Sequence, residues 1–211
     1  KEAMLALMDE VDELAARIGA VNTVAIKDGH RFGCNTDVAA AVGAIEKAVS
    51  RAGLAPLAGR SVLLVGAGGA ARAIAYGLRD KVARLTIANR TVERGRKLAA
   101  ELGAEACSLG EMEGLVPDIL INGTSVGMWP QVEESPVPAA MLREGMVVFD
   151  SVYNPIRTRL LGEAEAAGAV TASGLDWFVN QAAAQFELWT GVPAPRDVME
   201  EAVRRHLAAS Q

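Results

Sequence analysis

The chain has 211 residues, of which 51% are hydrophobic and 22% charged, and its formal net charge is −5. This length allows a full hydrophobic core, in one large domain or two small ones. The acidic balance leaves no basic surface for nucleic acid. The isolated cysteines Cys34 and Cys107 are typical of a reducing cytoplasm. We expect no membrane span, no signal peptide and no metal site, because no long apolar run and no ligand spacing occurs.

The N-terminal part mixes helical and strand patterns. Apolar residues at helical spacing predict one helix over residues 2–18. Residues 20–26 and 31–34 are strand candidates, joined by a hairpin-like turn at residues 27–30. Thr36 or Asp37 can cap a helix that runs to about Arg51, and a linker with Gly and Pro follows over residues 52–59.

From Ser61 onward strands and helices alternate regularly. Strands are predicted at residues 61–65, 84–88, 105–107, 118–121, 146–150 and 169–172, and helices end near residues 78, 102, 167, 189 and 208. Repeated β–α units imply a parallel, doubly wound sheet with right-handed crossovers. The fold class is therefore α/β, with a Rossmann-like, doubly wound parallel sheet.

The first of these units carries a glycine-rich turn, Gly66-Ala67-Gly68-Gly69-Ala70. A strand, such a turn and an Ala-rich helix together form the cradle for a dinucleotide pyrophosphate. Gly66 allows the tight turn, Gly68 lets the backbone approach the phosphates, and the free N–H groups of the helix meet the anion. A glycine-rich turn without a ligand is the alternative, and the flanking strand and helix favour the cofactor site.

The string Asn89-Arg90-Thr91 follows the second strand of the alternation, with Arg94 one helical turn further on. An NAD site normally has Asp or Glu at this strand end, to hold the ribose 2′-hydroxyl. Two guanidiniums and no carboxylate suit a 2′-phosphate instead. Taken alone, the two arginines would be solvated residues of a surface helix. With the glycine-rich turn upstream, they indicate NADP.

Several separated strings occur in a fixed order over almost the whole chain. They are GAVNTV (residues 19–24), CNTD (34–37), GAGGAAR (66–72), NRT (89–91), INGTSVGM (121–128), VYNP (152–155) and QAAAQFELWTG (181–191). Together they resemble the shikimate dehydrogenases. The resemblance implies reversible reduction of 3-dehydroshikimate to shikimate by NADPH. It also implies a domain plan: residues 1–37 as the remainder of a partial, smaller α/β substrate domain, 38–59 as a connecting helix and linker, 60–175 as the NADP domain, and 176–211 as helices that return to the substrate domain.

The resemblance assigns the acid/base pair to Lys1 and Asp37. The family's catalytic lysine closes a Pro-x-Lys string, which Lys1-Glu2 matches in part. Ketone reduction needs a proton at the oxygen, and a nearby carboxylate tunes and orients a lysine for that task. A terminal surface lysine and a helix-capping aspartate are the plain alternatives. The family's segment upstream of this lysine, with its Ser-x-Ser carboxylate site, is expected to be missing from the sequence.

The resemblance further assigns Asn22 to a substrate hydroxyl, Tyr153 to the substrate carboxylate and Gln181 to the substrate. Asn22 falls in a predicted strand, where asparagine is disfavoured unless its amide has a task. A turn residue, a core tyrosine and a surface glutamine are the respective alternatives. The remaining cofactor residues implied in this way are Thr124, Ser125, Val152 and Gly174.

Two other functions stay open from the sequence. One is a quinate/shikimate dehydrogenase with relaxed cofactor use, and the other is a non-catalytic NADP-binding module. We expect a cytoplasmic protein whose partners are NADP and a small-molecule substrate, with no nucleic acid and no membrane. A homodimer is left open.

Overall fold

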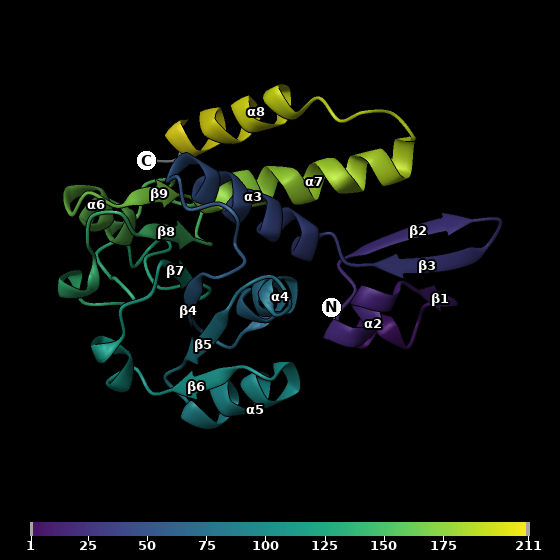
Figure 1. Cartoon of the computed structure of the whole chain (residues 1–211). Coiled ribbons are helices and arrows are strands. Elements are labelled where there is room, and N and C mark those ends of the chain that lie inside the picture. Colours follow the sequence, from purple (N-terminus) through teal and green to yellow (C-terminus); the bar gives the residue numbers. More distant parts are fainter. Residues whose placement is uncertain (1, 210–211) are drawn as a thin grey trace.

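The computed structural model describes residues 2–209, which form two β-sheets and the helices packed on them (Figure 1). The larger sheet has six parallel strands in the order β6-β5-β4-β7-β8-β9. The smaller sheet has three strands in the order β1-β3-β2. The larger sheet confirms the predicted doubly wound α/β fold, because its strand order reverses between β4 and β7.

The large sheet and its helices follow the predicted boundaries within about two residues. The strands are β4 (Ser61–Val65), β5 (Arg84–Ala88), β6 (Glu105–Cys107), β7 (Ile119–Asn122), β8 (Val147–Asp150) and β9 (Val170–Ala172). The connecting helices are α4 (Gly69–Leu78), α5 (Val92–Leu102), the short η1 (Glu111–Gly114) and η2 (Ala139–Met141), and α6 (Arg159–Ala166).

Alternate side chains of these strands enter two hydrophobic clusters. Val62 and Leu64 of β4 pack on the side that holds α3 (Asp37–Arg51), α4 and α5. Leu63 and Val65 pack on the other side, with η1, η2 and α6. Because both faces are covered, the four central strands β5, β4, β7 and β8 are largely buried, as expected for a parallel sheet, whereas the edge strands β6 and β9 are only partly buried.

The predicted helix over residues 2–18 is wrong. The structure has α1 (Glu2–Leu5), the short strand β1 (Glu10–Val11) and α2 (Glu13–Ile18) in its place. Asp12 caps α2 by accepting a hydrogen bond from the Ala15 backbone N–H at 2.8 Å. Asp9 accepts three hydrogen bonds from Arg31 of the neighbouring strand, at 2.8–2.9 Å. These contacts with residues distant in sequence outweigh the local helical spacing.

The hairpin of β2 (Thr23–Lys27) and β3 (His30–Cys34) extends away from the large sheet in Figure 1. Asp28 and Gly29 have φ of 51° and 80°, which is the two-residue turn that matches the twist of a hairpin. The predicted strand began at residue 20, whereas β2 begins at Thr23, so Asn22 lies just before the strand.

The last two helices are α7 (Gly174–Thr190), which runs beside α3, and α8 (Arg196–Ala209), which packs on α7 (Figure 1). Trp189 of α7 donates its indole N–H to the Val24 carbonyl of β2 at 3.0 Å. Trp177 donates to the Asp37 carbonyl at 2.8 Å. Helix α7 therefore ties the large sheet to the N-terminal residues. Within residues 2–209, no helix is long and apolar enough to cross a bilayer.

Candidate nucleotide and substrate sites

The glycine-rich turn lies at the carboxyl edge of β4, where the sheet order reverses. Gly66 has φ of 116°, and a Cβ there would lie 2.8 Å from Cγ2 of Thr124. Gly68 and Gly69 are exposed, and no heavy atom lies within 4 Å of where their Cβ atoms would stand. The free space and the unpaired first N–H groups of α4 fit a phosphate group.

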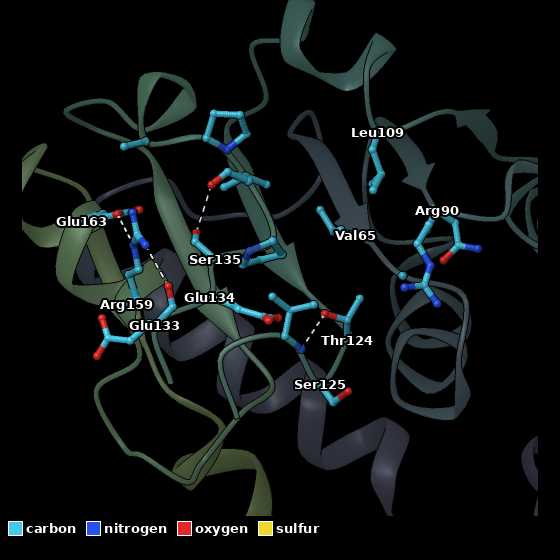
Figure 2. A pocket seen from close by; sticks show the side chains of 17 residues that line it. Val65, Arg90, Leu109, Thr124, Ser125, Glu133, Glu134, Ser135, Arg159 and Glu163 are labelled. Carbon is cyan, nitrogen blue, oxygen red and sulfur yellow. Dashed lines mark hydrogen bonds and ion pairs between the residues drawn. The ribbon is translucent and has the colours of Figure 1, made fainter. Parts of the chain in front are cut away.

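A groove of about 720 Å³, which we call the nucleotide groove, begins at this turn (Figure 2). Arg90 lies on one side of it in Figure 2, and Thr124 and Ser125 lie near its middle. Gly66 and Asn89 also line it. The opposite side, around Glu133, Glu134, Ser135, Arg159 and Glu163, is acidic and polar. Five residues predicted to bind the cofactor thus surround one cavity.

A second groove, of about 590 Å³, lies on the other side of the turn and is called here the α4–α5 groove. Ala67, Gly68 and Gly69 line it together with Arg94. The predicted arginine pair is therefore divided between two grooves, with Arg90 in the first and Arg94 in the second. Thr91, also predicted to bind cofactor, is the N-cap of α5. Its backbone carbonyl accepts a hydrogen bond from the side-chain amide of Asn89 at 2.8 Å.

A third cavity, of about 460 Å³ and called here the substrate cavity, brings together the predicted substrate residues. Asn22, Asp37, Tyr153 and Gln181 all line it, although they come from four separate stretches of the chain. Gly69 and Ala70 of the glycine-rich turn, and Gly174, line the same cavity. The candidate substrate residues therefore face the start of the helix that would hold the cofactor phosphates.

The amide of Asn22 is held firmly by its neighbours. Its Oδ1 accepts hydrogen bonds from the Thr36 backbone N–H at 2.9 Å and from the Thr23 hydroxyl at 2.8 Å. Its Nδ2 donates to the Thr36 hydroxyl at 3.1 Å, which leaves its second N–H for a ligand. The side-chain oxygen of Asn35 accepts from the Asp37 N–H at 3.0 Å. Thr36, one of the two expected caps, is the N-cap residue of α3, but its side chain makes no capping hydrogen bond.

Aromatic side chains shape the other wall of the substrate cavity. The ring of Tyr153 stacks on Phe178, with centroids 4.5 Å apart and planes inclined by 22°. Gln181 donates to the Phe178 carbonyl at 3.1 Å, within its own helix. Asp37 is the first residue of α3 and is held there by the Trp177 contact with its carbonyl. This arrangement fixes the ring of Tyr153 and the backbone of Asp37 at the cavity.

A buried carboxylate connects the loops after β7 and β8. Asp150 accepts hydrogen bonds from the Thr158 hydroxyl at 2.6 Å, the Asn122 amide at 2.9 Å and the Val152 N–H at 2.9 Å. The side-chain Oδ1 of Asn122 in turn accepts from the hydroxyl of Thr124 at 2.7 Å. Burial raises the pKa of Asp150 to about 6, against the opposing effect of these hydrogen bonds. One network thus orders both the Thr124 loop and the Tyr153 loop.

Three further residues were predicted for the site, namely Val152, Gly174 and Lys1. Val152 is 3% exposed, and its carbonyl accepts the Gly174 N–H at 3.1 Å. A Cβ at Gly174 would collide with the Ser151 carbonyl oxygen, so glycine allows α7 to begin directly on this loop. Lys1 lies outside the described residues.

The sequence reasoning missed Gln185 and Ser151, which also line the substrate cavity. Gln185 donates its amide to the Thr23 hydroxyl at 3.1 Å. Its spacing of four residues from Gln181 places both on one helix face, and that spacing was a usable signal. Among residues 2–209, no group of three or more His, Cys, Asp or Glu side chains is placed to hold a metal ion.

The parallel sheet, the glycine-rich turn at its reversal point and the adjoining cavities define an α/β dinucleotide-binding protein. The family model "Shikimate / quinate 5-dehydrogenase" matches residues 46–153, and "Shikimate 5'-dehydrogenase C-terminal domain" matches residues 174–204. The chain belongs to the shikimate dehydrogenase family, as its sequence strings predicted.

Individual relatives agree with this family. The chain is 46% identical to a chloroplastic bifunctional 3-dehydroquinate dehydratase/shikimate dehydrogenase of Arabidopsis thaliana, over 94% of this chain and 35% of that protein. It is 42% identical to a shikimate dehydrogenase (NADP(+)) of Shouchella clausii, over 98% of this chain and 76% of the relative. The crystal structure of Thermus thermophilus shikimate 5-dehydrogenase with NADP(H) and shikimate superposes with a TM-score of 0.84, at 41% identity, over 97% of this chain and 75% of that one.

Proposed function

We propose that this protein catalyses the reversible, NADPH-dependent reduction of 3-dehydroshikimate to shikimate. The observation that carries the proposal is the substrate cavity, where Asn22, Asp37, Tyr153 and Gln181 meet Gly69 and Ala70 of the glycine-rich turn. This places groups suited to hydroxyl and carboxylate recognition beside the candidate phosphate cradle. Family membership and the relatives with NADP support the same assignment.

When bound, the dinucleotide supplies a hydride to the carbonyl carbon of the substrate. The protein's own residues then have two tasks, which are to orient the ring and to deliver a proton to the carbonyl oxygen. Asn22 and Gln181 orient hydroxyl groups, and Tyr153 donates its phenolic hydrogen to the carboxylate. Lys1 gives the proton in the reductive direction and takes it back in the other, while Asp37 orients the lysine. The carbonyl becomes a hydroxyl, and one hydride and one proton are consumed.

The proposed cofactor is NADP and not NAD. Asn89 and Arg90 end the second strand where an acidic residue would serve the 2′-hydroxyl of NAD. Within residues 2–209, Arg90 forms no hydrogen bond or ion pair through its side chain, so its guanidinium is available to a phosphate. We also propose that the protein works in the cytoplasm and takes no nucleic acid as a partner. Assembly as a homodimer stays open.

A steady-state assay tests the function. The intact protein, once purified, should oxidise shikimate with NADP⁺, with NADPH appearance followed at its absorbance band, and should reduce 3-dehydroshikimate with NADPH. Parallel assays with quinate and with NAD⁺ should give much lower kcat/KM. Binding of NADP⁺ without turnover of either substrate would contradict the enzyme and favour a binding module. Comparable rates with quinate would favour the broader dehydrogenase.

A further inference from the structure

One face of α5 lines the α4–α5 groove with an unusual group of charges. The residues of that face are Arg94, Lys97, Leu98 and Glu101, and the spacing of three, four and seven residues places them in one row along the helix. Arg72 of α4 lines the groove from the opposite side. Three cations therefore face this groove against a single carboxylate, in a chain whose net charge is negative.

The single carboxylate is already engaged by α4. Glu101 forms an ion pair with Arg72 at 2.8 Å and accepts a hydrogen bond from the Tyr76 hydroxyl at 3.1 Å. The Arg72 hydrogen bond is the main reason that the pKa of Glu101 is lowered, and the charge of Lys97 contributes least. Arg72 is also held by the Ile18 carbonyl at 2.9 Å. Arg72 and Glu101 thus largely satisfy each other.

Arg94 and Lys97 are left without such partners. Neither side chain forms a hydrogen bond or an ion pair with any residue from 2 to 209. Both are exposed. Their neighbour Arg96 differs, since it pairs with Glu93 at 3.1 Å and does not line the groove. Two positive charges on one helix face therefore point to an anion in the groove.

The local geometry directs Lys97 toward the glycine-rich turn. Helical side chains lean toward the N-terminal end of their helix, which brings the Lys97 ammonium up toward Arg94. Gly95 allows the start of α5 to lie close to the end of β5, because a Cβ there would stand only 3.3 Å from that of Asn89. The row of cations consequently begins beside the residues that would meet the 2′-phosphate.

From this arrangement we propose that Lys97 is a further determinant of cofactor specificity, which together with Arg94 holds the 2′-phosphate of NADP from the α4–α5 groove. Arg90 then meets the same nucleotide from the nucleotide groove, so the phosphate lies between cations of both grooves. The inference deepens the proposed function and rests on it. Lys97 acts on binding only, because no proton or hydride passes through it.

The test compares ligands that differ only in the 2′-phosphate. Affinities of the full chain are measured by calorimetry for NADP⁺ and NAD⁺, and for the fragments adenosine 2′,5′-bisphosphate and AMP. Lys97→Gln should weaken NADP⁺ and the bisphosphate by roughly three- to tenfold, which suits an exposed charge-assisted contact. NAD⁺ and AMP should change less than twofold. Lys97→Arg should retain most of the wild-type NADP⁺ affinity. The loss of NADP⁺ affinity in Lys97→Gln, relative to wild type, should shrink at high salt.

Arg96→Gln is the matched control, because it removes a positive charge from the same helix outside the groove. It should leave all four affinities within twofold. Unchanged NADP⁺ affinity in Lys97→Gln, or equal losses for NADP⁺ and NAD⁺, would overturn the inference. If Arg90→Ala weakens NADP⁺ binding and Lys97→Gln does not, the inference about Lys97 is overturned while the proposed function stands. A wild-type chain that binds neither NADP⁺ nor the bisphosphate would overturn the proposed function instead.

Discussion

The large sheet and the N-terminal unit (residues 2–36) are stabilised by different interactions. In the large sheet, the central strands β5, β4, β7 and β8 are largely buried, and apolar side chains such as Leu63 and Leu64 alternate between two hydrophobic clusters. In the N-terminal unit, Asp9, Asp12 and Asn22 connect segments that are 14 to 23 residues apart through hydrogen bonds to backbone and side-chain groups.

The difference matters because each region carries a different part of the proposed site. The large sheet supplies the glycine-rich turn and Arg90, whose positions follow from local strand and helix patterns. The N-terminal unit and the start of α3 supply Asn22 and Asp37, whose positions depend on a polar network. Substitutions should therefore separate chemistry on one side from cofactor binding on the other.

The largest effect is expected from the proposed acid/base pair. Lys1→Ala removes the proton carrier, and Asp37→Asn keeps the side-chain shape but removes its charge. Each should lower kcat by at least ~10²-fold, since general acid–base groups contribute ~10²–10⁴-fold. The double variant should be little worse than the poorer single one if the two act as a unit. Steady-state kinetics at saturating shikimate measures this.

Cofactor titration is the control for that pair. NADP⁺ affinity should be nearly unchanged in all three variants, because its proposed determinants lie after residue 59. Two results would count against the assignment. The first is a double variant whose loss of kcat equals the product of the two single losses, because Lys1 and Asp37 would then act independently. The second is a lysine variant with normal kcat and a raised KM, which makes Lys1 a binding residue.

The next effect concerns Asp150, the polar exception within the large sheet. Its pKa is about 6 when folded and near 3.8 when unfolded, so between these values the folded state binds more protons. The unfolding free energy should therefore fall as pH rises from about 4 to about 7, on the order of 2–3 kcal/mol. Asp150→Asn should remove this fall. Denaturant titrations at several pH values measure it.

Asp118 is a control of opposite sign for that experiment. Hydrogen bonds from the Ser61 backbone and hydroxyl hold its pKa below the usual value. Its contribution to stability is present above the unfolded pKa and is lost as pH falls through the folded pKa. Asp118→Asn should therefore reduce stability at neutral pH. Identical pH slopes for wild type and Asp150→Asn would contradict the role of the buried carboxylate.

Arg90→Ala tests the large-sheet side of the comparison. The substitution should weaken NADP⁺ binding by about 1.5–3 kcal/mol, the range for hydrogen bonds to charged groups, and leave NAD⁺ binding little changed. Arg94→Ala, in the α4–α5 groove, should weaken NADP⁺ binding less than Arg90→Ala does. Calorimetric titration of both cofactors measures the difference, and equal losses for NADP⁺ and NAD⁺ would contradict discrimination by Arg90.

The large sheet and the N-terminal unit also differ in how well the sequence predicted them. Strands such as β4 and β5 were predicted to the residue, because their apolar runs end at glycines and polar turns. The helix predicted over residues 2–18 was wrong, because Asp9 binds Arg31 of β3 and Asp12 binds Asn35 just after that strand, and local periodicity carries no such information. The sequence strings also led to four candidate residues that line the substrate cavity. They predicted neither the division of the arginines between two grooves nor the contact from Gln185 to Thr23.

The smallest effect is expected from Asp12, and it isolates the N-terminal unit. Asp12 caps α2 through one oxygen and accepts the Asn35 N–H through the other at 3.0 Å. Asp12→Ala should destabilise this unit by about 1 kcal/mol, the usual cost of a lost helix cap. Amide hydrogen exchange should quicken over residues 10–36 and stay unchanged in β4 and β7, since local opening need not involve the large sheet. Asp80→Ala, which removes an exposed carboxylate beside Arg79, should alter neither region. Faster exchange throughout the large sheet would show that the two regions unfold together, and the proposed independence of substrate and cofactor sides would then fail.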